Sequence, residues 1–307
     1  MDSSVELDGA VAIVTGAGDG LGRAEALGLA SAGARLVLGD VRADAAHAVA
    51  DEIKAMGGEA VVVVGDVAEW ATGESLVTTA VSTYGRLDAL VNNAGVVRDR
   101  MVFTMSEEEW DLVIRVHLRG HFVTTRHATA YWRDRHKSGA PTSGSIVNTS
   151  SEAFLLGSPG QPNYAAAKGG IVSFTLSTAR SCARYGVRAN AICPRGRTAM
   201  TEQLMGAAPT EGFDPMAPEH VAPLVTYLAS PLSSRITGEV FVVHGGVAAL
   251  LAPPTVRATF RTDHGGWTTD AIRSALDPFF VADPPQPGFV SEETLPLAES
   301  TFDDPRS

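Results

Sequence analysis

Short apolar runs alternate along this chain with longer alanine-rich segments of helical period, and this alternation limits the fold more than any other feature. The runs are residues 11–14, 35–38, 60–64, 87–91, 145–148, 187–192 and 239–243. They are continuously apolar, which is typical of parallel strands that are covered on both faces. Joined by helices, they predict an α/β fold: a doubly wound, seven-stranded parallel sheet with helices on both faces.

Local signals place three of the connecting helices. Apolar residues at helical spacing predict one helix over about 45–56. Ser106 followed by Glu109 forms a capping box, which predicts a helix start there, with Trp110 facing inward. A third helical pattern runs from about 163 to 185.

Composition changes at about residue 250. Residues 1–250 hold all the predicted strands and are expected to form one domain. Residues 251–307 are rich in proline, with one possible helix at 268–276. A segment this short buries little core of its own, so we expect a C-terminal extension packed on or near the same domain.

Charge and cysteine content narrow the range of partners. A formal net charge of −11 gives no general attraction to nucleic acid or to an anionic membrane. Two cysteines, Cys182 and Cys193, are too few for a disulfide framework or a zinc site, so we expect no metal. The N-terminus lacks an apolar segment, and no apolar stretch is suited to a membrane helix. These features favour a cytoplasmic protein without nucleic-acid or membrane partners.

A glycine-rich turn follows the first predicted strand and opens a helix. Its glycines let the backbone approach a pyrophosphate closely, and the helix N-terminus offers free N–H groups and a positive dipole end. A glycine-rich turn is weak evidence alone, but a strand before it and a helix after it are the context that the motif needs. The turn predicts a Rossmann-type dinucleotide site that includes Gly16, Asp19, Gly20, Leu21 and Gly22.

The ends of the next strands indicate which dinucleotide binds. Asp40 lies 18 residues after Gly22 and can accept hydrogen bonds from both ribose hydroxyls of NAD, whereas it would repel the 2′-phosphate of NADP. Arg42 is the nearby basic residue, and it is also explained as a solvated charge at a helix start. Asp66 ends the third strand, where the adenine would lie, and the small residues of 92–95 would let the backbone approach the ribose. We therefore expect NAD.

A tyrosine and a lysine share one helix face at Tyr164 and Lys168. A nearby ammonium favours the phenolate and lowers the pKa of a tyrosine, which allows acid/base catalysis near neutral pH. Ser151 lies at the carboxyl end of the fifth strand, where ligands bind in open α/β sheets, and its hydroxyl could hold a substrate oxygen. Ser150 is the alternative for that role.

Together these motifs resemble the short-chain dehydrogenase/reductase family over about residues 5–250. The resemblance implies a one-domain Rossmann fold and NAD(P)-dependent interconversion of alcohols and ketones. It implies that Tyr164 is the acid/base, that Ser151 orients the substrate oxygen, and that Lys168 binds the nicotinamide ribose and lowers the tyrosine pKa. It also implies cofactor contacts from Asp66, Val67, Asn93, Ala94 and Gly95.

Two positions depart from the family pattern. His117 stands where the family often has an asparagine as a fourth catalytic residue, so it is a candidate for the proton relay or a packed core histidine. Arg195 follows Pro194 where the family usually has glycine. Thr198, one residue earlier than in the family pattern, is the candidate for the contact with the cofactor carboxamide.

Three segments, 98–100, 117–120 and 148–153, resemble the (3R)-hydroxyacyl-CoA dehydrogenase of peroxisomal multifunctional enzymes and its bacterial relatives. That resemblance implies oxidation of a 3-hydroxyacyl thioester, most readily an acyl-CoA of fatty-acid or sterol side-chain β-oxidation, by a homodimer or homotetramer. The alternatives are a 3-oxoacyl-carrier-protein reductase, a steroid dehydrogenase and, more distantly, a non-catalytic dinucleotide-binding sensor. Residues 201–218 are expected to shape the substrate pocket.

Overall fold

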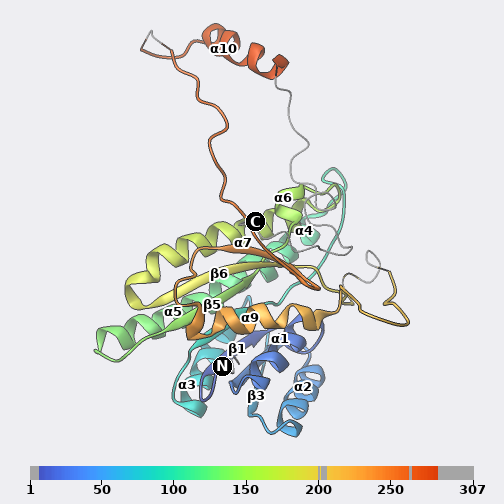
Figure 1. Ribbon diagram of the computed structural model, residues 1–307, viewed down its shortest axis with the longest axis vertical. Helices are drawn as coiled ribbons and strands as arrows, with labels where there is room; N and C mark the ends of the chain where they lie inside the picture. Colours follow the sequence, from blue (N-terminus) through green and yellow to red (C-terminus); the bar gives the residue numbers. More distant parts are fainter. Residues whose placement is uncertain (1–6, 200, 202–205, 263–264, 283–307) are drawn as a thin grey trace, which may run out of the picture.

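One eight-stranded sheet forms the centre of the molecule (Figure 1). The computed structural model describes residues 7–199, 201, 206–262 and 265–282. The strand order is β3-β2-β1-β4-β5-β6-β7-β8, and the first seven of these strands pair in parallel at the seven predicted runs. Their bounds are Val11–Thr15 (β1), Arg35–Asp40 (β2), Ala60–Val64 (β3), Ala89–Asn92 (β4), Gly144–Thr149 (β5), Val187–Pro194 (β6) and Val240–His244 (β7). The predicted fold class is confirmed.

The eighth strand corrects the predicted number of seven. β8 (Val247–Leu250) pairs antiparallel with β7, from His244 opposite Val247 onward. Gly245, with φ of 46°, and Gly246 make the connection. A Gly-Gly pair is typical of a two-residue hairpin turn, so the chain folds back along the sheet edge.

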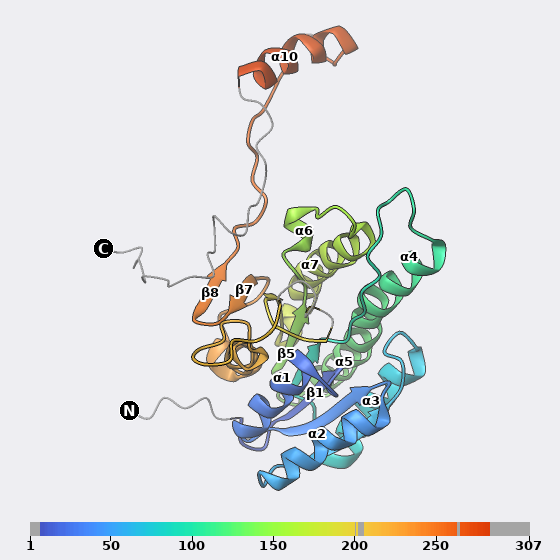
Figure 2. The ribbon, with the colours of Figure 1, turned by 90° about the vertical axis from the view of Figure 1, so that its right-hand side faces the viewer.

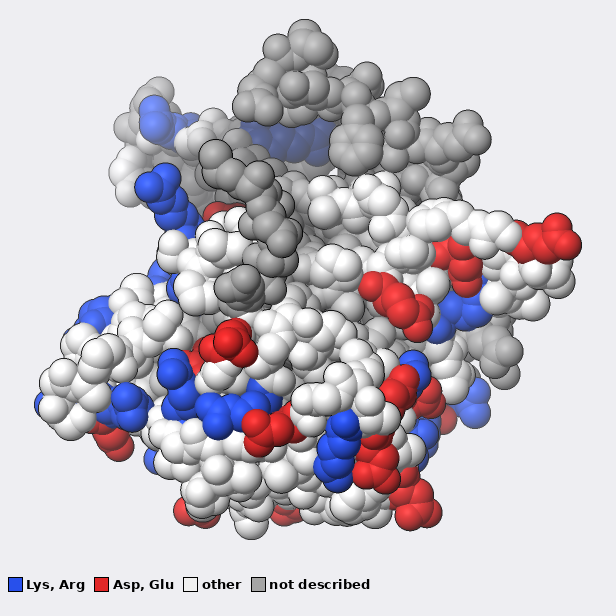
Figure 3. Space-filling model, turned by 60° about the horizontal axis from the view of Figure 1, so that its bottom comes forward, with Lys and Arg blue, Asp and Glu red and all other residues white. Residues whose placement is uncertain are grey.

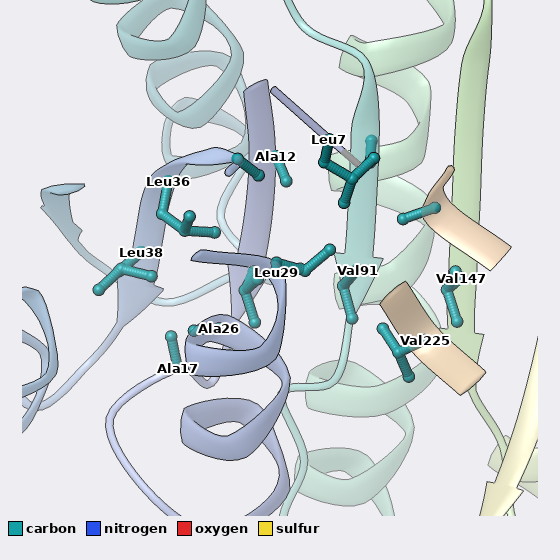
Figure 4. Close-up of a cluster of buried hydrophobic side chains, with 14 of the residues drawn as sticks. Leu7, Ala12, Ala17, Ala26, Leu29, Leu36, Leu38, Val91, Val147 and Val225 are labelled. Carbon is teal, nitrogen blue, oxygen red and sulfur yellow. The ribbon is translucent and has the colours of Figure 1, made fainter. Parts of the chain in front are cut away.

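Six helices make the two outer layers: α1 (Gly20–Ser31), α2 (Ala43–Ala55), α3 (Trp70–Tyr84), α5 (Gly120–Lys137), α7 (Pro162–Cys182) and α9 (Ala222–Ala229). α1, α2 and α9 cover one face, where they pack on Ala12 and Val14. Figure 4 draws part of this cluster, including Ala12 of β1, Leu29 of α1 and Val225 of α9. α3, α5 and α7 cover the other face, where they pack on Val11 and Ile13. Successive residues of β1 thus enter opposite cores, which explains why the strands are apolar throughout.

The predicted capping box begins α4 (Glu107–Ile114). The Ser106 hydroxyl accepts from the Glu109 N–H at 3.2 Å, and the Glu109 carboxylate accepts from the Ser106 N–H at 3.1 Å. Trp110 was predicted to face inward, but it is 40% exposed. That prediction is wrong because the first turn of α4 extends beyond the sheet (Figure 2).

A π-helix connects α4 to α5. This segment, η1 (Arg115–Arg119), begins directly after α4 and ends directly before α5. A π-helical turn holds one residue more than an α-helical turn, which changes the direction of the neighbouring side chains. Such turns are frequent at functional sites. The shorter elements are α6 (Ala153–Leu156), η2 (Ala183–Tyr185), η3 (Pro218–His220) and η4 (Pro231–Ser233).

The chain beyond β8 leaves the sheet as an extended segment. It leads to α10 (Thr269–Ala282), which begins one residue after the start of the helix predicted at 268–276 and continues past its end. α10 stands apart from the sheet in both views (Figures 1 and 2). Residues 283–307 lie outside the described part of the chain.

Acidic and basic side chains lie among one another on the face drawn in Figure 3. Among the described residues, no helix combines the length and the apolar character needed to cross a membrane.

Candidate active site

Most of the residues predicted to bind the cofactor line one cavity of about 740 Å³, which lies at the carboxyl ends of the strands. The turns after β1, β2, β3 and β4 contribute to its wall, as expected for the ligand site of an open α/β sheet. The predicted residues that line it are Gly16, Asp19, Gly20, Leu21, Asp40, Asp66, Val67, Asn93, Ala94, Gly95 and Thr198.

The glycine-rich turn has the tight geometry that a phosphate cradle needs. Gly16 has φ of 64°, a conformation that favours glycine. A Cβ on Gly22 would lie 2.1 Å from the Gly16 carbonyl oxygen, so Gly22 allows α1 to pack on the turn rather than lining the cavity. Asp19 is the N-cap of α1, and its carboxylate accepts from the Gly20 N–H at 2.7 Å.

Asn93 supports this turn from β4. Its side-chain amide donates to the carbonyl oxygens of Thr15 at 3.1 Å and Gly16 at 3.2 Å. The Thr15 hydroxyl in turn accepts from the backbone N–H of Asn93 at 3.0 Å. The Asn93 side chain therefore braces the glycine-rich turn.

Asp40 is buried at the end of β2, with 6% of its surface exposed. One carboxylate oxygen accepts from the Gly18 N–H at 2.9 Å, and the other accepts from the Arg42 N–H at 2.9 Å. The Arg42 guanidinium lies 3.6 Å from Asp40 and 3.6 Å from Asp19. Arg42 is thus a partner of both acids as well as a solvated charge, and the carboxylate is fixed at the cavity wall.

Asp66 has a partner far away in the sequence. Arg115, in the π-helix, donates to Asp66 at 2.6 Å and also pairs with Glu69 at 2.5 Å. The contact joins residues 49 positions apart, so no local pattern could have revealed it.

Ser151, Tyr164 and Lys168 come together beyond the Gly95 side of the cavity. The Lys168 ammonium lies 5.3 Å from the centre of the Tyr164 ring and donates to the Thr149 carbonyl at 2.7 Å. The Ser151 side chain is near enough to Tyr164 to lower its pKa. Ser150 is turned away, since its hydroxyl donates to the Lys168 carbonyl at 2.9 Å. Ser151 is therefore the serine that faces Tyr164.

Burial controls the pKa values in this cluster. It raises the pKa of Tyr164 to about 12, while the Ser151 side chain acts in the opposite direction. The lowering of the tyrosine pKa by Lys168 stays a prediction. Burial also lowers the pKa of Lys168 to about 7, because the charged form is poorly solvated.

His117 connects this cluster to the cofactor cavity. It is 2% exposed, and its ring packs edge-on against Tyr164 with 5.2 Å between ring centres. A Cβ on Gly95 would lie 2.4 Å from its Cε1, so glycine lets the imidazole reach the cavity wall. Nε2 lies 2.7 Å from the Val96 carbonyl oxygen and 3.0 Å from the Val96 nitrogen. Burial, then the Lys168 charge, hold the pKa of His117 well below its usual value, so the ring is neutral.

Thr198 lies opposite the glycine-rich turn. A Cβ on Gly20 would lie 2.9 Å from the methyl group of Thr198. The Thr198 N–H donates to the Thr201 hydroxyl at 2.8 Å. Of the residues expected to shape a substrate pocket, 202–205 lie outside the described part of the chain.

A family model described as short chain dehydrogenase matches residues 10–208. The chain belongs to the short chain dehydrogenase family. The resemblance inferred from the motifs is therefore confirmed, and the protein is an oxidoreductase. Members of this family use nicotinamide dinucleotides, and the glycine cradle with the fixed Asp40 fits such a group.

Several known proteins are similar in sequence to this short chain dehydrogenase over most of its length. Hydroxyacyl-CoA dehydrogenase ChsB1 from Mycobacterium tuberculosis is 49% identical over 95% of both chains. Peroxisomal multifunctional enzyme type 2 from Mus musculus is 38% identical over 89% of this chain, which corresponds to 37% of that protein. A 3-oxoacyl-[acyl-carrier-protein] reductase from Synechocystis is 41% identical over 77% of this chain and 96% of that protein.

The fold has a solved counterpart. The crystal structure of a short chain dehydrogenase from Mycobacterium avium superposes with a TM-score of 0.83 at 45% identity, over 92% of this chain and 97% of that chain.

Proposed function

We propose that this dehydrogenase interconverts a 3-hydroxyacyl thioester and its 3-oxoacyl form, with acyl-CoA as the substrate. The observation that carries the proposal is the arrangement of Ser151, Tyr164 and Lys168 with neutral His117 where the family often has asparagine. The relatives that share most of this chain include a protein named hydroxyacyl-CoA dehydrogenase. Fatty-acid or sterol side-chain β-oxidation is the corresponding metabolic setting.

The chain's own groups handle the proton. When bound, the nicotinamide ring supplies the hydride acceptor or donor. Ser151 holds the substrate oxygen, and Tyr164 exchanges a proton with that oxygen. Because its pKa is raised to about 12, Tyr164 is protonated near neutral pH and ready to donate during ketone reduction. Oxidation instead requires the phenolate, so its rate depends on how far the pH favours that form.

Lys168 has a second role in this proposal. Its ammonium points to the Thr149 carbonyl beside the tyrosine ring. From there we assign it to the nicotinamide ribose. Neutral His117 offers one ring nitrogen to Val96 and leaves Nδ1 without a protein partner among the described residues. A water at that nitrogen would complete a proton relay of the kind for which the family often uses asparagine.

We assign NAD rather than NADP to the cavity. The buried Asp40 carboxylate lines the wall and would repel a 2′-phosphate. Arg42 offsets part of this charge, although its guanidinium is shared with Asp19 and is 56% exposed. We also assign the contact with the nicotinamide carboxamide to Thr198.

The second candidate function is reduction of a 3-oxoacyl group on a carrier protein, because one relative bears that name. That reaction usually uses NADPH, which the Asp40 carboxylate disfavours. A steroid dehydrogenase is a further alternative. A non-catalytic sensor is less well supported, because Tyr164 and Lys168 are both present and adjacent.

The assembly and setting complete the proposal. We propose a cytoplasmic homodimer or homotetramer, with the catalytic domain at 1–250 and an extension at 251–307. Light scattering of the purified chain measures the oligomeric state directly.

A substrate panel tests the proposed function. NADH formation is measured with 3-hydroxyacyl-CoA thioesters of several lengths, with steroids and with simple secondary alcohols, using Tyr164→Phe as the inactive control. The proposal predicts the highest kcat/KM for a CoA thioester. A steroid or a simple alcohol as the best substrate would contradict it.

A further inference from the structure

A buried ion pair joins the two strand ends that carry Ser151 and Thr198. Glu152 directly follows Ser151 after β5, and Arg195 follows Pro194 at the end of β6. Arg195 donates from Nε to Glu152 Oε2 at 2.7 Å and from Nη2 to Oε1 at 2.8 Å, which is a forked, two-bond contact. The side chains of Arg195 and Glu152 are only 11% and 9% exposed.

The ion pair continues the connection between the strands past the end of their ladder. β5 and β6 pair as far as Thr149 opposite Ile192, and one further bond runs from the Ser150 N–H to the Ile192 carbonyl at 2.7 Å. Beyond that point the side chains of Glu152 and Arg195 bridge the two segments. The Arg195 N–H also donates to the Val243 carbonyl at 3.0 Å, so Arg195 is anchored to β7 as well.

Both charges act on the neighbouring groups. Burial raises the pKa of the Cys193 thiol to about 12, and the Glu152 charge adds to this in the same direction. Burial, then Arg195, lower the pKa of His244, which ends β7 with 1% of its surface exposed. Without its partner, the Glu152 carboxylate would be a nearly buried negative charge next to Ser151, where the substrate oxygen gains negative charge during the reaction.

Stability alone is a weak reason for such a pair. Taking two charges out of water costs about as much as their attraction returns, and well-packed apolar replacements are often neutral or stabilising. Positional precision is a stronger reason, because a misplacement of about 1 Å can lower a rate by roughly 100-fold.

We propose that Glu152 and Arg195 are a positioning pair for hydride transfer, which holds Ser151 and the turn 195–198 in one fixed arrangement. The pair keeps the substrate oxygen and the Thr198 wall of the cavity in register, and it neutralises the carboxylate beside the reacting atoms. The inference rests on the roles proposed above for Ser151 and Thr198.

A double replacement separates positioning from stability. Arg195→Met, Glu152→Gln and the double variant Glu152→Leu/Arg195→Met are compared with the wild type for kcat, KM, NADH affinity by fluorescence, and Tm. The single variants are expected to lose stability and at least about tenfold in kcat. The double variant is expected to recover Tm while its kcat remains at least about tenfold low.

A matched control is available in the same chain. Glu52→Gln breaks the forked pair of Arg23 and Glu52, which joins α1 to α2 and is about 40% exposed. This variant is expected to keep the wild-type kcat. A fall in kcat as large as that of Glu152→Gln would mean that breaking any forked pair produces the effect, and it would overturn the proposal.

Two further results decide the question. A double variant with wild-type Tm and a kcat within about twofold of wild type would reduce the pair to a structural role. If that variant does not fold, Arg195→Lys keeps the charge but loses the fork, and it is expected to lower kcat at least threefold with little change in Tm. Unchanged kcat in Arg195→Lys would then overturn the proposal. Ser151→Ala in the same assay shows separately whether Ser151 has its proposed role.

Discussion

Glu25 is a carboxylic acid held in an apolar environment, and its replacement by glutamine has a calculable effect on stability. The side chain lies on α1, is fully buried, and has neither carboxyl oxygen hydrogen-bonded among the described residues. Burial raises the pKa of Glu25 from its ordinary value of 4.5 to about 8, and the positive charge of Lys168 acts in the opposite direction. Near neutral pH the folded protein therefore keeps a proton on this group.

The sign of the effect follows from proton binding. Between pH 4.5 and about 8 the folded state holds the Glu25 proton and the unfolded state does not. Stability is then highest below the unfolded pKa and falls as pH rises, by about 1.4 kcal/mol per pH unit. From about pH 5 to about pH 8 the loss amounts to roughly 4 kcal/mol. Glu25→Gln has no proton to lose and removes this slope.

Urea denaturation, followed by tryptophan fluorescence, measures the free energy of unfolding of the wild type and of Glu25→Gln at each pH. At about pH 5 the wild type and Glu25→Gln should differ by less than about 1 kcal/mol, whereas at about pH 8 the variant should be more stable by about 3–4 kcal/mol. Glu74→Gln, on an exposed position of α3, is the control and should leave the slope unchanged. A constant difference between wild type and Glu25→Gln across this pH range would refute the reasoning.

Four further predictions concern the active site. Tyr164→Phe should lower turnover roughly 10²–10⁴-fold while NAD binding, followed by fluorescence, persists; a rate above about a hundredth of wild type would exclude Tyr164 as the acid/base. The oxidation rate should rise with pH above about 7, because burial disfavours the phenolate, and a flat profile would contradict this. NAD should bind at least about tenfold more tightly than NADP, and titrations of Asp40→Ala should show a smaller gap; equal affinities in the wild type would contradict the assignment. His117→Asn should keep substantial activity while His117→Leu loses it at near-wild-type Tm, and an active His117→Leu would reduce His117 to a packing residue.

Sequence was sufficient wherever the determining interaction is local or periodic. The seven apolar runs form seven parallel strands because the inner strands are buried on both faces, and a continuously apolar run shows this condition. The Ser106–Glu109 capping box lies within one turn, so its residues alone indicate it. The cofactor turn was predictable for the same reason, since strand, glycines and helix follow one another directly.

Interactions between distant segments were not predictable in this way. The helical spacing of apolar residues predicted that Trp110 faces inward, but Trp110 is exposed. The spacing does not show whether another element covers that part of the helix. β8 was not predicted although Gly245 and Gly246 indicate a hairpin turn, because the four residues 247–250 at the end of the predicted domain are too short a run to stand out as a strand. Spacing along a helix places Lys168 beside Tyr164, but it does not reveal the burial that raises the pKa of Tyr164.

The π-helix shows how one local irregularity can serve two parts of the site. Within its five residues, Arg115 reaches Asp66 on the cofactor side, and His117 reaches Val96 and the Tyr164 ring on the catalytic side. Side chains two residues apart on a helix point roughly 200° from one another, so Arg115 and His117 leave this segment in nearly opposite directions. The segment therefore lies where the cofactor wall and the proton-transfer groups meet, at the contact between Gly95 and His117.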